Sequence, residues 1–200
     1  MSTPLKDINP IYAPTPTPIP PHLQQTEPLA ITKTIQTLHL KPHIEGGYFT
    51  ETDKHPQRIP NINAASTPTN PKPCIDAEDT SIAAPRGHES RAASSSIQYL
   101  LTPGSPVGTF HLNKSRTVHA LHYGRARYVV IHADLKEGDG GKVPVETFVV
   151  GDDVERGEKL VWVVPGGKYK GCFLLPGEGM GRGVLISEVS YGLICIGCVG

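Results

Sequence analysis

Residues 96–133 read SIQYLLTPGSPVGTFHLNKSRTVHALHYGRARYVVIHA, and this stretch is the clearest guide to the fold. It holds four short runs rich in apolar and β-branched residues, at 97–102, 109–112, 118–123 and 128–133. Turn-forming Gly and Pro residues separate the runs, as at Pro103-Gly104 and Gly124. Short strands that follow one another at such close intervals predict an all-β sandwich or barrel.

The same pattern continues on both sides of this stretch. Towards the C-terminus, further strands are expected at 143–150, 160–164, 169–175 and 184–189, each ending near a Gly or Pro. Towards the N-terminus, Gly46-Gly47 predicts a turn and residues 48–50 a strand. Before them, apolar residues spaced as on one helix face predict a short helix from Leu29 to Leu40, which Pro42 ends.

Proline and glycine are unevenly distributed along the 200 residues. Fifteen of the 20 prolines lie at or before Pro85, and 18 of the 21 glycines lie at or after Gly104. Alternating prolines favour extended polyproline II structure, so residues 1–28 are predicted to be a disordered tail. Residues 53–92 hold six prolines and few large apolar residues. We therefore expect one domain at 29–200, interrupted by a disordered insertion at 53–92.

Charge and hydropathy exclude several classes of protein. Nineteen basic and 19 acidic residues give a formal net charge of zero, which offers no electrostatic surface for nucleic acid. No run of about 18 apolar residues predicts a membrane span, and the N-terminus lacks the apolar core of a signal peptide. Four scattered cysteines without such a signal do not suggest a disulfide framework. The expected location is the cytoplasm, with the nucleus as an alternative.

Several blocks of the sequence resemble one known family. They are His43-Ile-Glu-Gly-Gly-Tyr-Phe49, Ser96-Ile-Gln-Tyr-Leu-Leu-Thr102, Trp162-Val-Val-Pro-Gly-Gly-Lys-Tyr-Lys170 and Leu185-Ile-Ser-Glu-Val189. In this order they resemble the DUF985 family, also called cupin-5, from about Leu29 to Val189. The resemblance implies a cupin double-stranded β-helix, a jelly-roll barrel similar to the RmlC-type sugar epimerases, and a homodimer. It implies no established reaction, and residues 190–200 depart from the family pattern.

The metal site of many cupins is not preserved in the resemblance. The cupin motifs place three histidines and a glutamate around a divalent metal. Aligned on this chain, those positions become His111, Asn113, Thr117 and Lys170. An amide, a hydroxyl and an ammonium group do not replace imidazole and carboxylate as metal ligands. We therefore expect no metal and no cofactor, with a site built from His111, Glu45 and either His119 or His122 as the alternative.

Candidate catalytic residues cluster near the expected mouth of the barrel. His111 follows the Gly108 turn on a strand that should line the interior, and a histidine there can remove a proton next to a carbonyl group. Glu45 could orient it, and Tyr48 or Tyr169 could return a proton from the opposite face. The structural alternatives are that Glu45 caps a turn and that the tyrosines are half-buried strand residues.

Other residues are candidates for ligand binding. Lys168, Lys170 and Arg127, together with Arg125, would form a basic group for a phosphate or carboxylate if their strands converge. A solvated strand edge is the alternative for these residues. Trp162 would form a pocket wall or pack in the core. His119 shares a strand with His122, and the alternation of side chains places the two on opposite faces.

The sequence thus predicts a protein that binds a small polar or anionic metabolite in its barrel without a metal. Two enzymatic alternatives stay open: a metal-independent epimerase or isomerase of a sugar or keto compound with His111 as base, and a metal-dependent cupin enzyme. The first requires that His111 point into the barrel with a carboxylate within hydrogen-bond reach.

Overall fold

The computed structural model describes residues 27–60, 90–135, 143–175 and 181–191. These residues form one α-helix, one short 3₁₀-helix and a series of strands. In chain order they are α1 (Leu29–Thr37), β1 (Lys41–Pro42), β2 (Tyr48–Lys54), β3 (Arg58–Pro60), β4 (Ser90–Ala92), β5 (Ser95–Leu101), β6 (Val107–Asn113), β7 (Thr117–Tyr123), β8 (Ala126–Ile131), β9 (Val145–Val150), η5 (Val154–Arg156), β10 (Val161–Val164), β11 (Lys168–Leu174) and β12 (Val184–Ser190).

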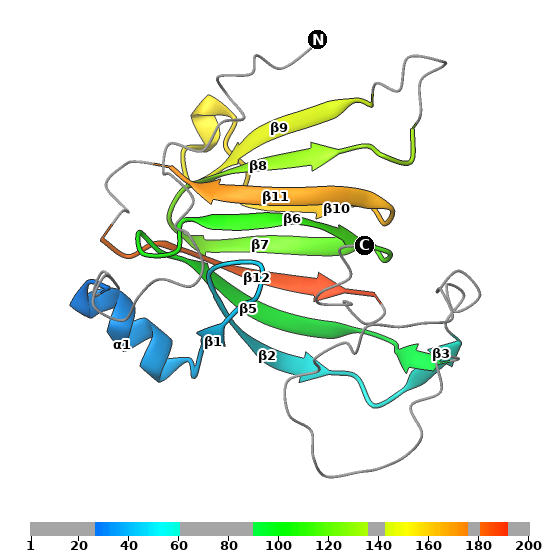
Figure 1. Cartoon of the computed structure of the whole chain (residues 1–200), viewed down its shortest axis with the longest axis horizontal. Coiled ribbons are helices and arrows are strands. Elements are labelled where there is room, and N and C mark those ends of the chain that lie inside the picture. The colour runs from blue at the N-terminus through cyan, green and yellow to red at the C-terminus, as the bar shows by residue number, and fades with distance from the viewer. Residues whose placement is uncertain (1–26, 61–89, 136–142, 176–180, 192–200) are drawn as a thin grey trace.

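The described strands form two large antiparallel sheets that face each other and a separate two-stranded sheet of β3 and β4. The larger sheet has the order β1-β2-β5-β12-β7-β10, and the smaller has the order β6-β11-β8-β9 (Figure 1). Strands far apart in sequence are neighbours, since β12 lies between β5 and β7, and β11 lies between β6 and β8. The predicted all-β jelly-roll class with one short N-terminal helix is confirmed.

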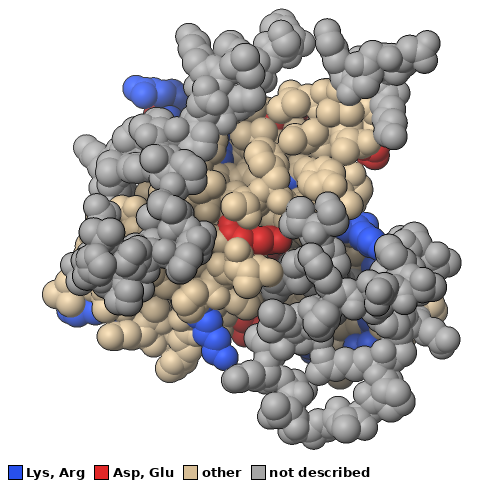
Figure 2. Space-filling model, in the orientation of Figure 1, with Lys and Arg blue, Asp and Glu red and all other residues tan. Residues whose placement is uncertain are grey.

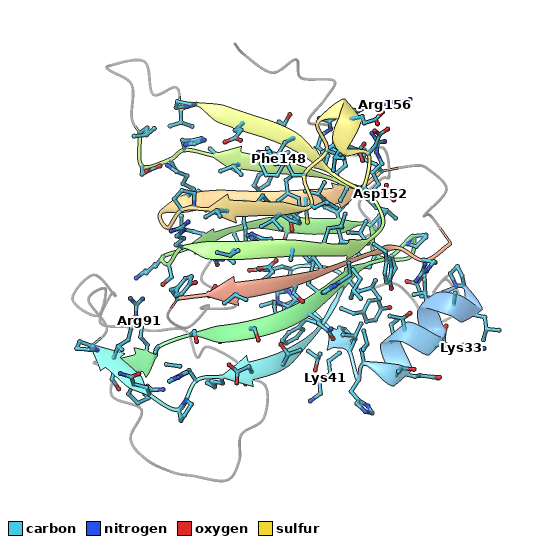
Figure 3. All side chains as sticks on the ribbon, turned by 180° about the vertical axis from the view of Figure 1, so that it is seen from behind. Lys33, Lys41, Arg91, Phe148, Asp152 and Arg156 are labelled. Carbon is cyan, nitrogen blue, oxygen red and sulfur yellow. The ribbon has the colours of Figure 1, made fainter. Side chains whose placement is uncertain are left out.

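Helix α1 covers the outer face of the larger sheet. Its buried residue Ile31 packs against Leu100 of β5 and Leu185 of β12, while Lys33 points away from the sheet (Figure 3). The helix ends at Thr37, earlier than the predicted Leu40. His39 adopts a left-handed φ of 53°, and the N–H of Leu40 donates to the carbonyl of Ile35 at 2.9 Å. This is a Schellman-type ending, in which the last apolar residue caps the helix instead of extending it.

Strands occupy both ends of the segment 53–92, for which the sequence predicts a disordered insertion. Strand β2 continues to Lys54, and β3 pairs with β4 through the registers Arg58–Ala92 and Pro60–Ser90. Both ends of the segment are therefore strands. Backbone hydrogen bonds hold them, so they form although the segment contains few apolar residues. Residues 61–89, like the proline-rich residues 1–26, lie outside the described part of the chain.

Side chains alternate between the barrel interior and its outer surface, and the strand registers arrange the interior in layers. At one end of the barrel the interior is apolar, with Leu101, Ala126, Val150, Leu174 and Val184. In the next layer along the barrel axis, charged side chains point into the interior. Glu188 pairs with Ile97 on one side and His119 on the other, and Lys170 pairs with His111. The antiparallel registers thus bring polar residues from four strands to one level of the barrel.

Among the described residues, the face drawn in Figure 2 shows no continuous basic region. Lys and Arg atoms lie in separate groups, and the most prominent acidic atoms lie near the centre of this face. This distribution is compatible with the expectation that the protein does not bind nucleic acid, which stays a prediction. The one α-helix among the described residues is too short to cross a bilayer.

A tight turn at 43–47, between β1 and β2 of the larger sheet, packs against β6 of the smaller sheet. Gly46 has a φ of +97°, and its backbone packs so closely on β6 that a Cβ atom would lie 2.1 Å from the carbonyl oxygen of Val107. The hydroxyl of Tyr99 donates to the Gly46 carbonyl at 2.8 Å. The backbone N–H of Thr109 donates to the Glu45 carbonyl at 2.7 Å, which fixes the turn to β6.

We expect Gly46→Ala to destabilise the protein more than Gly157→Ala. Gly157 also has a positive φ, of 80°, but no atom lies within 4 Å of the place that a Cβ atom would occupy there. Alanine at 157 should therefore lower the free energy of unfolding only by the strain of a left-handed backbone, about 1–2 kcal/mol. Alanine at 46 should add the clash with Val107, a further loss of about 1–3 kcal/mol. Urea unfolding of the two variants measures the difference, and equal losses would contradict this packing.

Candidate functional site

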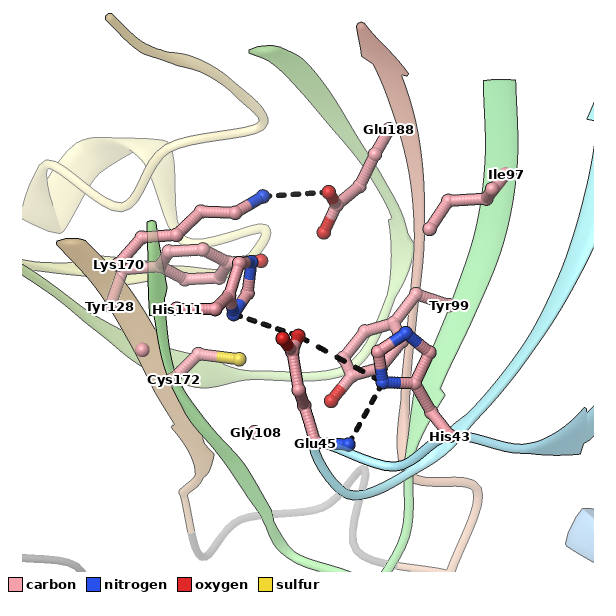
Figure 4. A pocket seen from close by; sticks show the side chains of 11 residues that line it. His43, Glu45, Ile97, Tyr99, Gly108, His111, Tyr128, Lys170, Cys172 and Glu188 are labelled. Atoms are coloured by element: carbon pink, nitrogen blue, oxygen red, sulfur yellow. Dashed lines mark hydrogen bonds and ion pairs between the residues drawn. The ribbon is translucent and has the colours of Figure 1, made fainter. Parts of the chain in front are cut away.

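The described residues enclose a pocket between the two sheets, and eleven residues line it. Its empty volume is about 440 Å³, part of which is open to solvent. The polar and ionisable residues of the lining come from both sheets and from the 43–47 turn. They are His43, Glu45, Tyr99, His111, Tyr128, Lys170, Cys172 and Glu188, and the rest of the lining is Ile97, Gly108 and Gly171 (Figure 4).

His111 and Glu45 form a close pair at one side of the pocket. The Nδ1 atom of His111 lies 3.0 Å from Glu45 Oε2 and 3.1 Å from the carbonyl oxygen of Thr109. Both partners accept hydrogen bonds, so the proton of a neutral His111 ring resides on Nδ1 and the lone pair on Nε2. The side chain of Glu45 is only 9% exposed, and its backbone is tied to β6. The histidine and its orienting carboxylate are therefore held in place together.

His43 lies behind Glu45 and supports it. The N–H of Glu45 donates to His43 Nδ1 at 3.1 Å, and the His43 ring packs edge-on against Phe49 and Tyr99. Burial lowers the pKa of His43, against the opposing effect of the Glu45 charge. A neutral ring that accepts at Nδ1 fits this position. His43 thus completes a His–Glu–His arrangement that sequence reasoning missed, although His43 opens the first block of the family resemblance.

Lys170 and Glu188 form a buried ion pair across the pocket from Glu45 (Figure 4). Lys170 Nζ lies 2.6 Å from Glu188 Oε2, and the two residues are 1% and 6% exposed. Burial alone would raise the pKa of Glu188, but the charge of Lys170 and the hydrogen bond from its ammonium group hold that pKa well below its usual range. The pair is therefore an ammonium and a carboxylate.

His119 holds the lysine from the side away from the pocket. Its Nε2 lies 2.8 Å from Lys170 Nζ, and its ring stacks on Trp162 with 5.0 Å between the centroids. Burial and the Lys170 charge lower the pKa of His119. The ring is therefore neutral and accepts a hydrogen bond from the ammonium group. Two of the three Lys170 N–H bonds are thus committed, to Glu188 and to His119, and the third has no hydrogen-bond partner among the described residues.

Three further groups of the lining stay protonated. Burial raises the pKa values of the Tyr99 and Tyr128 hydroxyls well above their usual range. Burial also raises the pKa of the Cys172 thiol to about 12. At neutral pH the two phenols are therefore hydrogen-bond donors, and Cys172 is an inert part of the wall rather than a thiolate nucleophile.

Some of the predicted site residues do not reach the pocket. Tyr48 lies on the outer face of β2, packed against the α1 side of the sheet, because strand alternation turns it away when its neighbour Phe49 points inward. Tyr169 alternates with the inward-facing Lys168 and Lys170. Tyr48 therefore cannot serve as the catalytic residue that the sequence suggested, and Tyr169 does not line the pocket.

The predicted ligand-binding residues separate in the structure. Lys168 is ion-paired with Asp134 at 2.7 Å, and Arg127 lies beside Thr147 on the outer side of β8. The expected convergence of these basic residues is wrong, since only Lys170 lines the pocket. Trp162 and His119 pack in the core behind the lining, so neither forms a pocket wall. Of the predicted residues, Glu45, His111 and Lys170 meet in one cavity.

The residues at the cupin metal positions do not fit a metal ion. The Nδ2 of Asn113 donates to Thr117 Oγ1 at 3.1 Å, and Lys170 is paired with Glu188. An ammonium group at this level of the barrel repels a cation. Within the described ranges, no group of three or more His, Cys, Asp or Glu side chains is placed to hold a metal ion.

Comparisons with known proteins identify relatives of this chain. The family model described as Cupin superfamily (DUF985) matches residues 32–192. The uncharacterized protein YML079W of Saccharomyces cerevisiae is 38% identical over 165 residues, which cover 81% of this chain and 70% of the yeast protein.

Two solved structures are similar in fold. A hypothetical protein from Leishmania major superposes with a TM-score of 0.60 at 27% identity, over 80% of each chain. Protein SO0799 from Shewanella oneidensis superposes with a TM-score of 0.53 at 20% identity, over 84% of this chain and 79% of the other. The second likeness shows the fold alone.

Lys170→Met should destabilise the protein far more than Lys168→Met. Removal of Lys170 leaves Glu188 buried without its cation, which typically costs about 3–5 kcal/mol. Removal of Lys168 leaves Asp134, whose side chain is 40% exposed and remains solvated. Chemical denaturation of both variants at pH 7 measures the contrast. A loss for Lys170→Met no larger than for Lys168→Met would show that the buried pair does not support the fold.

Proposed function

This chain belongs to the DUF985 family of the cupin superfamily, and we propose that its barrel binds a small polar metabolite and transfers a proton at a carbon next to a carbonyl group. The observation that carries this proposal is the His111–Glu45 pair, 3.0 Å apart, in the lining of a pocket to which Lys170, the β11 neighbour of His111, also contributes. A histidine that acts as a base in the barrel needs a carboxylate within hydrogen-bond reach. Glu45 lies at that distance from His111.

His111 supplies the base. With its Nδ1 proton directed to Glu45 and Thr109, the Nε2 atom carries the free electron pair. When Nε2 accepts a proton from the ligand, the ring becomes positively charged next to the Glu45 carboxylate. That carboxylate stabilises the imidazolium and keeps the ring in one orientation. Glu45 is thus a positioning residue and His111 the catalytic one.

Lys170 supplies the complementary charge. Its Cα pairs with that of His111 across the β6–β11 ladder, so the two side chains are direct neighbours on the inner face of the smaller sheet. A ligand carbonyl oxygen that accepts the third N–H of Lys170 places its adjacent carbon near His111. As the C–H electron pair forms a C=C bond, the carbonyl π electrons move to oxygen, where the ammonium stabilises the developing negative charge.

The proton returns to the ligand in the second half of the reaction. Return to a different carbon or oxygen by His111 gives an isomer, and return to the opposite face of the same carbon gives an epimer. Neither Tyr48 nor Tyr169 lines the pocket, and Tyr128, which does, lies on β8 of the same sheet as His111, so solvent water is the proton source for the opposite face in this proposal. Both outcomes conserve atoms and electrons and require no external oxidant.

A panel of uncharged aldoses and ketoses tests the proposal. Thermal-shift measurements identify the sugars that bind, since a ligand at a hundred times its Kd stabilises by about 2.7 kcal/mol. Bound sugars are then incubated with the protein in D₂O, and NMR follows loss of the C–H signal next to the carbonyl. We expect exchange with the wild type, and a rate lower by a factor of about 10²–10⁴ for His111→Ala.

His122→Ala is the matched control for this experiment. His122 lies on the outer face of β7, where its Nε2 is 2.7 Å from Ser187 Oγ. This variant should exchange at the wild-type rate. Exchange that His111→Ala leaves unchanged would refute the catalytic proposal. A sugar that binds without any exchange above the protein-free rate would reduce the function to ligand binding.

A further inference from the structure

We propose that the pocket selects uncharged ligands and that Glu188 is the residue that sets this preference. The inference rests on the proposed function and specifies its substrate class: neutral hydroxylated carbonyl compounds, such as free aldoses and ketoses, rather than their phosphates or acids. It narrows the sequence-based expectation of a polar or anionic metabolite.

The fixed charges of the lining support this selection. Lys170 is the one lysine or arginine among the residues that line the described pocket, and Glu45 and Glu188 are two carboxylates. With neutral histidines, two carboxylates against one ammonium leave an excess of one negative charge. Protonation of His111 would bring the sum to zero. In neither state does the lining carry the positive charge that a phosphate or carboxylate group requires.

Other cations near the barrel either have a carboxylate partner of their own or lie on its outer side. Lys168 contacts both oxygens of Asp134 at 2.7 and 2.8 Å, and Arg125 is ion-paired with Glu158. Arg127 lies on the outer side of β8, toward Thr147. None of these three residues lines the pocket, so an anion inside it would meet only the ammonium that Glu188 already neutralises.

The same lining offers much to a neutral polar ligand. Lys170 and Tyr128 present donors, Glu45 and the Nε2 of His111 present acceptors, and all four residues line one cavity (Figure 4). Ile97 and the Tyr99 ring add apolar surface, which fits the C–H face of a sugar. Hydroxyl groups can both donate and accept, so a compound with several of them satisfies this mixture without bringing charge.

Glu188 sets the preference because of where its carboxylate lies. It is 2.6 Å from Lys170 Nζ, it is itself buried, and its strand places it at the same level as His119. Glu188→Gln keeps the shape of the side chain and a hydrogen-bond acceptor for Lys170 but removes the charge. The ammonium would then be free to attract an anion, so the substitution should reverse the preference rather than abolish binding.

Matched ligands test the inference directly. Glucose, glucose 6-phosphate and glucuronate, and fructose with fructose 6-phosphate, are titrated against the wild type by calorimetry. We expect the neutral member of each set to bind and its anionic counterparts to bind about tenfold more weakly or worse. With Glu188→Gln the anionic members should gain affinity relative to the neutral one. Glu158→Gln, which removes a carboxylate from the ion pair outside the pocket, should retain the wild-type preference.

Each outcome bears on a different claim. If the anionic sugars bind the wild type as well as the neutral ones, and His111-dependent exchange persists, the charge selection is wrong while the proposed function stands. If no member of either class binds, the proposed function fails and the selection fails with it. If Glu188→Gln does not fold, the affinities of the wild type still test the charge selection. Equal affinities for the neutral and the anionic members of each set would overturn the inference.

Discussion

The side chain of Lys170 lies almost wholly inside the barrel, and its ammonium group can remain there only because Glu188 and His119 surround it. A buried charge without a partner is strongly unfavourable, whereas a paired and hydrogen-bonded one is tolerated. The three residues come from β11, β12 and β7, so both sheets must keep their register for the group to form. This constraint links the fold to the site, because the arrangement that satisfies Lys170 also places His111 beside it.

The second element of the site depends on a single turn. Residues 43–47 leave the larger sheet and lie on β6 of the smaller one, where the Glu45 carbonyl accepts from both the N–H and the hydroxyl of Thr109. The close approach of Gly46 to Val107 allows this contact. The turn therefore carries a carboxylate to a histidine that lies about 65 residues further along the chain. The candidate site is thus assembled by contacts between distant segments, as is usual for antiparallel sheets with long-range pairing.

Much of the fold could be predicted from the sequence, but less of the site. Short alternating runs between Gly and Pro turns indicated the strands, and the same alternation separated His119 from His122. Alternation does not say which face is the inner one, so Tyr48 was placed in the site although Phe49 occupies the inward position. Glu188 belongs to a family block yet was not recognised as a site residue, since only the β5–β12–β7 register shows that it faces Lys170. The burial of Trp162 behind His119 likewise depends on tertiary packing.

The proposed chemistry requires that His111 hold its proton on Nδ1, directed at Glu45, and keep Nε2 free as a base inside the pocket. Nitrogen-15 NMR of the imidazole rings can detect this state, because the two neutral tautomers have distinct nitrogen shifts and long-range couplings. We expect the Nδ1–H tautomer for neutral His111 in the wild type, because both the Glu45 carboxylate and the Thr109 carbonyl accept from Nδ1. A neutral His111 that carries its proton on Nε2 would contradict this assignment.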